Sequence, residues 1–394
     1  MAAEARAIVA EGLESGITAD FGDNMSVAWV KARADRFISG PAVKAAIRDI
    51  DPEGVEFRRR KQIRIRKELE AHGPGWMWSA DAYDKLQPYG IQVYGIIDAY
   101  SRFMIKLFIG HDVHTSVAVQ KYYLMAVALY GYPKLTRTDM GVETPLMVEC
   151  QGQFREAGDK RNLSVGDYHI YGASVHNVRI EGWWSFLRRA QSGQWISLFE
   201  GYHQKGWFRK KNRWDIRALQ YVYMPIVRKA FRETQEAWNA HTIRSQRNRP
   251  YLPTGKPVYL WRSSNAPNYL KKPDKQLLQR LQDEVQSWDH ERYLTSEVEV
   301  FCYNTLVQNG LPGIIESASA RDDTHTIAYL LLREHLERYE RRHGFFEDIR
   351  SPEGSHEWIA RDKERRSGLQ NEIEMERRMM LQADYRMRDH VIQE

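Results

Sequence analysis

Three acidic residues of this chain lie in segments that are not expected to be simply exposed to solvent. Asp81 follows an apolar run that contains Trp76 and Trp78, Asp139 closes a short strand-like segment, and Glu181 falls early in an expected helix. Three carboxylates on separate elements can hold two divalent cations, the apparatus of phosphodiester cleavage and transfer. These residue types therefore indicate metal-dependent chemistry on a phosphodiester.

The elements that must position these acids follow from the apolar periodicity of the surrounding chain. Three strand-like runs come first, and helices then alternate with strands up to the helix that carries Glu181. Such an order predicts an α/β fold in which helices cover both faces of a mixed sheet. The expected strands are 76–83, 91–100, 102–112, 133–139 and 164–172, and the expected helices before Glu181 are 116–132 and 144–158.

Four sequence blocks in this segment resemble a known family. They are ADAYDKLQPYG from Ala80, IIDAYSR from Ile96, RTDMGVET from Arg137 and HNVRIEGWW from His176. Their fixed order is more specific than any lone acid. The segment resembles the catalytic core of the integrase and DDE-transposase superfamily, above all the eukaryotic, transposon-derived integrase core domain proteins. The resemblance covers about residues 74–250 and extends weakly back to about residue 38.

The resemblance implies a ribonuclease-H-like mixed sheet flanked by helices, with additional helical segments at both ends. It implies that Asp81, Asp139 and Glu181 meet at one sheet edge as catalytic residues that bind two Mg²⁺ or Mn²⁺ ions. The expected activity is two-metal-ion DNA cleavage and strand transfer, as in integration and transposition. Two alternatives stay open: a domesticated, inactive core that binds nucleic acid or protein, and a nuclease of the same fold.

Each acid also has a structural interpretation. Asp81 could be a buried acceptor for backbone donors, and Asp139 could be an ordinary turn aspartate because aspartate and glycine favour turns. Glu181 could merely sit well near the positive end of a helix dipole. The sequence alone does not separate these roles from metal binding.

Several neighbours of the acids depart from the family pattern. Ser79 stands where the family often has histidine, Ala82 where it often has glycine, and Thr144 where asparagine is common. Gly182 follows the glutamate where a basic residue is common. These changes favour the inactive alternative, whereas the retained carboxylates favour an enzyme.

Four further residues are candidates for supporting the acids or binding DNA. Asn177 and Arg188 share a helical face with Glu181, because they lie four residues before it and seven after it. Lys85 could neutralise a phosphate, and Glu143 could position a base or a metal-bound water. A solvated lysine, a surface ion pair of Arg188 and helix capping by Glu143 are the alternatives.

Two features near the acids are predicted to be structural. Asp98 fits a hairpin turn in which Ser101 and Arg102 hold the bend. The aromatic pairs Trp183-Trp184 and Trp207-Phe208 are expected to lie in the core rather than to stack on bases.

Three regions are expected along the chain. Residues 1–72 form a basic, mostly helical segment, residues 74–252 the catalytic core, and residues 253–394 a helical region with a charged tail. Ser39 and Pro41 are expected to begin a helix that resembles the second helix of a helix-turn-helix unit. Plain amphipathic packing is the alternative for that helix.

A basic run precedes the core, since seven of the ten residues from Arg58 to Lys67 are basic. It could follow DNA phosphates, act as a nuclear import signal that places the protein in the nucleus, or form a solvated linker. The candidates for DNA contact are Arg58, Arg59, Arg60, Lys61, Arg64, Arg66 and Lys67.

The composition limits the class of protein further. The 394 residues include 58 Lys and Arg against 52 Asp and Glu, and the net charge of +6 favours a polyanionic partner such as DNA. The two cysteines cannot form a disulfide framework, and neither a signal peptide nor a membrane-spanning run is visible. We expect an intracellular protein that is not secreted and has no organic cofactor, and that could form a homo-oligomer.

Overall fold

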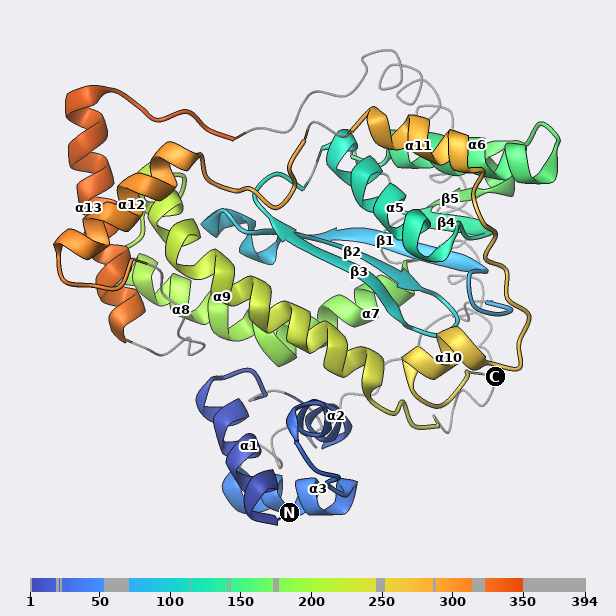
Figure 1. Cartoon of the computed structure of the whole chain (residues 1–394), viewed down its shortest axis with the longest axis horizontal. Helices are drawn as coiled ribbons and strands as arrows, with labels where there is room; N and C mark the ends of the chain where they lie inside the picture. Colours follow the sequence, from blue (N-terminus) through green and yellow to red (C-terminus); the bar gives the residue numbers. More distant parts are fainter. Residues whose placement is uncertain are drawn as a thin grey trace, which may run out of the picture.

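The structure is a computed structural model of the 394-residue chain (Figure 1). The basic candidates from Arg58 to Lys67 and the charged C-terminal tail lie outside the described residues. None of the described helices has both the length and the apolar composition that a bilayer span requires. The structure describes residues 2–18, 21, 23–52, 71–113, 115–139, 141, 143–172, 177–245, 252–285, 288–313 and 323–349.

A five-stranded mixed sheet lies at the centre of the molecule. Its strands are β1 (Met77–Tyr83), β2 (Gln92–Asp98), β3 (Met104–Gly110), β4 (Leu135–Thr138) and β5 (His169–Tyr171). They are ordered β3-β2-β1-β4-β5; β1, β2 and β3 are antiparallel, whereas β4 is parallel to β1 and β5 to β4. This is the predicted ribonuclease-H-like sheet, and each strand lies within its expected segment.

Helices cover both faces of the sheet, as predicted (Figure 1). One face carries α5 (Ser116–Tyr130), α6 (Pro145–Asp159) and α11 (Lys275–Asp283). The other face carries α7 (Val178–Leu187), α8 (Gly193–Gln204) and α9 (Arg213–Ala240). The shorter turns are η1 (Asp84–Tyr89), η2 (Val165–Asp167) and the π-helical turn η4 (Arg188–Ser192), which joins α7 to α8.

Side chains of β1 alternate between two cores, as a strand buried on both faces requires. Trp78 and Ala80 belong to the core beneath α5 and α6, whereas Tyr83 packs with residues of α7 in the second core. Asp81 has the same parity as Tyr83 and therefore faces α7.

The hairpin between β2 and β3 confirms the structural role predicted for Asp98. Its buried carboxylate accepts hydrogen bonds from the backbone N–H of Ser101 at 2.8 Å, the Ser101 hydroxyl at 2.6 Å and the Gly75 N–H at 2.9 Å. Arg102 completes the bend with a left-handed φ of 61°. Burial raises the pKa of Asp98 to about 6, and these donors oppose the rise.

Three N-terminal helices lie beside α9 (Figure 1). They are α1 (Ala2–Glu14), α2 (Asp23–Arg33) and α3 (Gly40–Ile50). The expected cap of the third is confirmed, because the Ser39 side chain accepts the N–H of Ala42 at 3.4 Å and a proline occupies the first turn. An ion pair of 2.9 Å between Arg33 and Glu233 joins α2 to α9.

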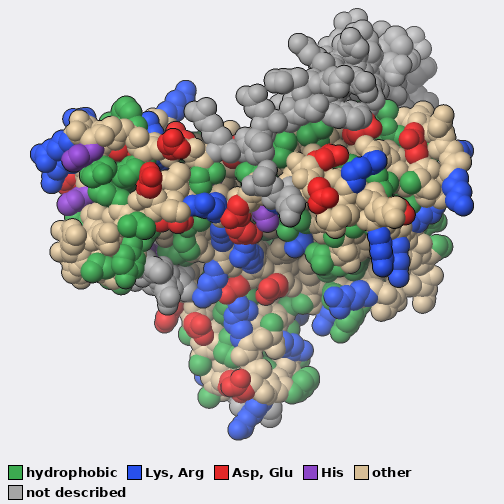
Figure 2. All heavy atoms as spheres, turned by 45° about the horizontal axis from the view of Figure 1, so that its top comes forward, with side chains coloured by type: hydrophobic (Ala, Val, Ile, Leu, Met, Phe, Trp, Pro, Cys, Tyr) green, Lys and Arg blue, Asp and Glu red, His purple; other side chains and the backbone are tan. Residues whose placement is uncertain are grey.

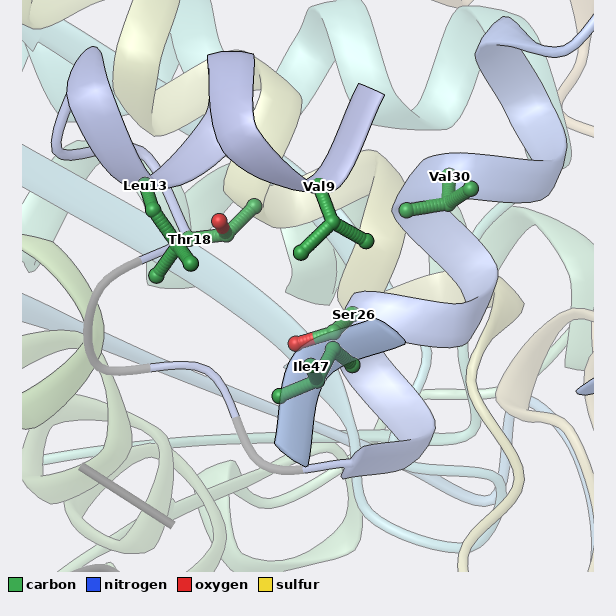
Figure 3. Close-up of a pocket in the computed structure, with 6 residues that line it drawn as sticks. All are labelled: Val9, Leu13, Thr18, Ser26, Val30 and Ile47. Atoms are coloured by element: carbon green, nitrogen blue, oxygen red, sulfur yellow. The ribbon is translucent and has the colours of Figure 1, made fainter. Parts of the chain in front are cut away.

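A small cavity lies between the three N-terminal helices (Figure 3). Its volume of about 10 Å³ accommodates about one water molecule, and most of its lining is apolar. It is therefore a packing gap rather than a ligand site. The lining residues are Val9, Leu13, Thr18, Ser26, Val30 and Ile47.

The C-terminal region is helical, as predicted, with α10 (Pro257–Ser263), α12 (Ser296–Gln308) and α13 (Asp323–His343). A buried ion pair between Arg217 of α9 and Glu340 of α13 links the C-terminal region to the core. The same Arg217 also pairs with Asp348 at 2.6 Å.

Candidate active site

The three predicted acids lie on three elements that meet at one edge of the sheet. Ser79 of β1 is in register with Arg137 of the parallel neighbour β4. Asp81 and Asp139 each follow two residues later, so both lie on the α7 face near the carboxyl ends of their strands. Glu181 lies in the first turn of α7, the helix packed across β1 and β2.

The charges of these acids act on one another. The pKa of Asp81 is raised to about 8, mainly by burial and then by the charges of Asp139 and Glu181. Burial and the charge of Asp139 likewise raise the pKa of Glu181, and the Lys85 ammonium opposes that rise. Coupled carboxylates with raised pKa values are candidates for a functional site, because a cation would relieve their repulsion.

A tryptophan holds the carboxylate of Asp81. The indole N–H of Trp184 donates to Asp81 Oδ2 at 2.9 Å and lowers the pKa that burial raises. Gly95 of β2 lies directly opposite Asp81, and a Cβ on it would come within 2.7 Å of the Trp184 ring. Glycine is therefore required there, because it lets the indole lie against the strand.

Sequence reasoning did not find this contact. Trp184 is buried, as predicted for a core residue, but its N–H also donates a hydrogen bond to Asp81. Two signals were present: Trp184 lies three residues after Glu181, and Gly95 interrupts an otherwise apolar strand, where glycine often marks close approach.

Asp139 has a turn role as well as a place in the site. Its Oδ1 accepts the backbone N–H of Gly141 at 3.0 Å, which is the hydrogen bond expected of a turn aspartate. The hydroxyl of Thr138 donates to the Asp139 carbonyl at 2.8 Å and steadies the end of β4. The turn therefore orients the side chain whose charge acts on Asp81 and Glu181.

Two of the four supporting candidates lie beside the acids. Asn177 is buried, and its amide donates to the carbonyl of Ala80 at 3.1 Å, which ties the start of α7 to β1 next to Asp81. Lys85 is exposed in η1, and its charge reaches Glu181. The structure thus places Asn177 as a brace within the fold and Lys85 at the rim.

The charges of the other two candidates act on tyrosine hydroxyls of β1 and β2. Glu143 is buried immediately before α6, where Thr144 occupies the cap position, and its charge acts with those of Asp81 and Asp139 on the buried Tyr94 hydroxyl. Arg188 is exposed at the end of α7, and the group it acts on is the hydroxyl of Tyr83.

The three acids have the ligand chemistry of a divalent metal site but not its preformed geometry. Among the residues that the structure describes, no three His, Cys, Asp or Glu side chains stand in the arrangement of a metal site. Mg²⁺ and Mn²⁺ prefer carboxylate oxygens. The donor types and the mutual repulsion of the acids fit such ions, and the side chains would have to rearrange to bind them.

Comparison with known proteins defines the class. The family model of the integrase core domain matches residues 69–266, half of the chain, and the chain belongs to this family. Among curated proteins, no relative matches the chain significantly.

Solved structures add a weak likeness. One similar chain comes from a structure described as "CryoEM structure of simian T-cell lymphotropic virus intasome in complex with PP2A regulatory subunit B56 gamma". It is 14% identical, with 63% of this chain and 73% of that chain covered, and the TM-score is 0.33. At that score the likeness carries no structural argument.

Proposed function

We propose that this protein is a DDE-type integrase or transposase that cleaves DNA and transfers the strand. Asp81, Asp139 and Glu181 are the proposed catalytic and metal-binding residues. The observation that carries the proposal is the electrostatic coupling of these three carboxylates, which come from β1, the end of β4 and α7 of an integrase core.

The chain's own residues would prepare this reaction by orientation and charge. Trp184 holds one oxygen of Asp81, the turn at Gly141 orients Asp139, and Asn177 fixes the helix that presents Glu181. A pair of Mg²⁺ or Mn²⁺ ions would supply activation of the attacking oxygen and stabilisation of the leaving oxygen. The attacking group is a water in cleavage and a DNA 3′-hydroxyl in strand transfer.

DNA is the proposed partner, bound through its phosphates. The net charge is +6, and Lys85 and Arg188 are exposed near α7. On the face shown in Figure 2, basic side chains are scattered among acidic ones, so no single stripe there defines a DNA path. We also propose that the basic residues from Arg58 to Lys67 contact DNA phosphates. We further propose a homo-oligomer, a nuclear location and a division of the chain into the three regions given above.

The test is a strand-transfer assay with the full-length protein, labelled duplex oligonucleotides and Mn²⁺ or Mg²⁺. Joined products are expected from the wild type, and Asp81→Asn, Asp139→Asn and Glu181→Gln should each abolish them. Cleavage without joined strands would indicate a nuclease of the same fold. Full activity in all three variants would refute the site.

An inactive, binding-only core is the second candidate. The observations that favour it are the changed neighbours Ser79, Ala82, Thr144 and Gly182, together with the lack of a preformed metal centre among the described side chains. Calorimetric titration with Mn²⁺ separates the two, because an inactive core need not bind the ion. Absent Mn²⁺ binding together with retained DNA binding would establish this second candidate.

A further inference from the structure

Arg137 of β4 has no counter-ion among the residues that the structure describes. It is half-buried, and its Nε is enclosed with no hydrogen-bond partner. Within the described part of the chain, its guanidinium forms no hydrogen bond and no ion pair. Burial of an unpaired charge costs several kcal/mol in general, so an unpaired arginine inside a fold needs an explanation.

Other interior arginines of this protein do have partners. Arg155 pairs with Asp159 at 2.7 Å, and Arg228 pairs with Glu291 at 3.2 Å. The buried Arg217 pairs with Glu340. The buried Arg102 has no ion pair either, but its guanidinium donates to the Pro253 carbonyl. Arg137 differs from all four in lacking a hydrogen-bond acceptor in the described part of the chain.

Arg137 lies on the strand that leads into the candidate active site. Arg137 precedes Asp139 by two residues and therefore lies on the same face of the sheet. Its Nη2 lies over Gly172 at the end of β5, where an added Cβ would come within 3.1 Å. Its neighbour on β1, Ser79, is fully buried, and the Ser79 hydroxyl also has no partner among the described residues.

We infer that Arg137 binds a backbone phosphate of a DNA strand and holds that strand beside Asp139. A planar guanidinium pairs with phosphate through two parallel hydrogen bonds, and a DNA strand that reaches the acids brings its phosphates to this edge. The missing counter-ion is then the substrate itself. This inference rests on the proposed function, because it takes DNA as the substrate.

The test measures binding of a fluorescent DNA duplex to the full-length protein in EDTA, so that catalysis plays no part. Arg137→Gln should bind roughly tenfold more weakly, as expected for loss of one charge-assisted pair. The slope of log affinity against log salt should fall by about one. Arg338→Gln is the control: it removes the same charge from an exposed pair with Glu334 on α13, far from β4 in Figure 1, and should change affinity less than about twofold.

The phosphate is located with duplexes in which one phosphate at a time is a neutral methylphosphonate. One position should weaken wild-type binding and have no further effect on Arg137→Gln, because both changes remove the same contact. The free Arg137→Gln protein should unfold at the wild-type temperature or above, whereas a structural arginine would lower that temperature when replaced.

The outcomes separate this inference from the proposed function. If the wild type binds DNA and Arg137→Gln matches Arg338→Gln in affinity and salt slope, Arg137 is not a phosphate ligand. If Arg137→Gln unfolds at a clearly lower temperature, the arginine is structural and the inference fails. If the wild type does not bind DNA at all, the proposed function fails with it.

Discussion

Replacement of Trp184 by phenylalanine tests whether the site is arranged as the structure indicates. The change removes the N–H that donates to Asp81 at 2.9 Å and leaves the rest of the ring stack largely intact. A hydrogen bond to a charged group contributes about 1.5–3 kcal/mol, so Mn²⁺ binding should weaken roughly tenfold or more. The pKa of Asp81 should rise above its present value of about 8, because the lost donor had lowered it.

Trp183→Phe is a closely matched control. Trp183 is adjacent on α7 and equally buried, but its indole N–H has no hydrogen-bond partner among the described residues. Both variants lose a similar volume, so both should unfold at lower temperature in EDTA. Only Trp184→Phe should change the calorimetric affinity for Mn²⁺. Equal losses of affinity in both variants, or none in Trp184→Phe, would show that the indole does not orient the acid.

Two of the three further predictions concern Asp81, and the third concerns the attachment of the C-terminal helices. Gly95→Ala should push the Trp184 ring off the strand, destabilise the protein by about 1–3 kcal/mol in urea unfolding, and weaken Mn²⁺ binding as Trp184→Phe does. The pKa of Asp81 is 3.8 when unfolded and about 8 when folded, so the metal-free protein binds an extra proton between these values. Its free energy of unfolding should therefore fall as pH rises through this window, and Asp81→Asn should flatten the curve, measured by urea unfolding at each pH. Arg217→Met should cost about 3–5 kcal/mol in the same assay, because it leaves Glu340 buried without its closest cation.

The sequence predicted the five strands and the helices α5, α6 and α7, because their signals are local, but it did not predict α8 or α9. The aromatic and β-branched runs of β1, β2 and β3 mark strands, and Asp98 with Ser101 marks the hairpin between the last two. The approach of Asp81 to Asp139 was predicted only through the family resemblance. Parallel pairing joins residues more than 50 positions apart, and no local pattern specifies the register in which Ser79 meets Arg137.

The parts of the site that the sequence did not predict depend on what surrounds a side chain. Nothing in the RTDMG motif distinguishes a paired from an unpaired Arg137, since that property depends on which carboxylates come near after folding. The hydrogen bond of Trp184 could not be predicted for the same reason, because an indole ring can pack in a core and also donate its N–H to a carboxylate. The sequence analysis placed Trp184 in the core and did not predict its hydrogen bond to Asp81.

The raised pKa values connect the fold to its proposed chemistry. Burial, followed by the charges of Asp139 and Glu181, raises the pKa of Asp81 to about 8, so this side chain favours its protonated form near neutral pH. A divalent ion that binds Asp81 must then displace this proton, so its affinity should increase with pH. Because the unfolded chain releases this proton near pH 3.8, the metal-free fold loses stability as pH rises towards 8, and a cation bound to Asp81 would offset that loss. A metal affinity that is the same at pH 6 and pH 9 would contradict this coupling.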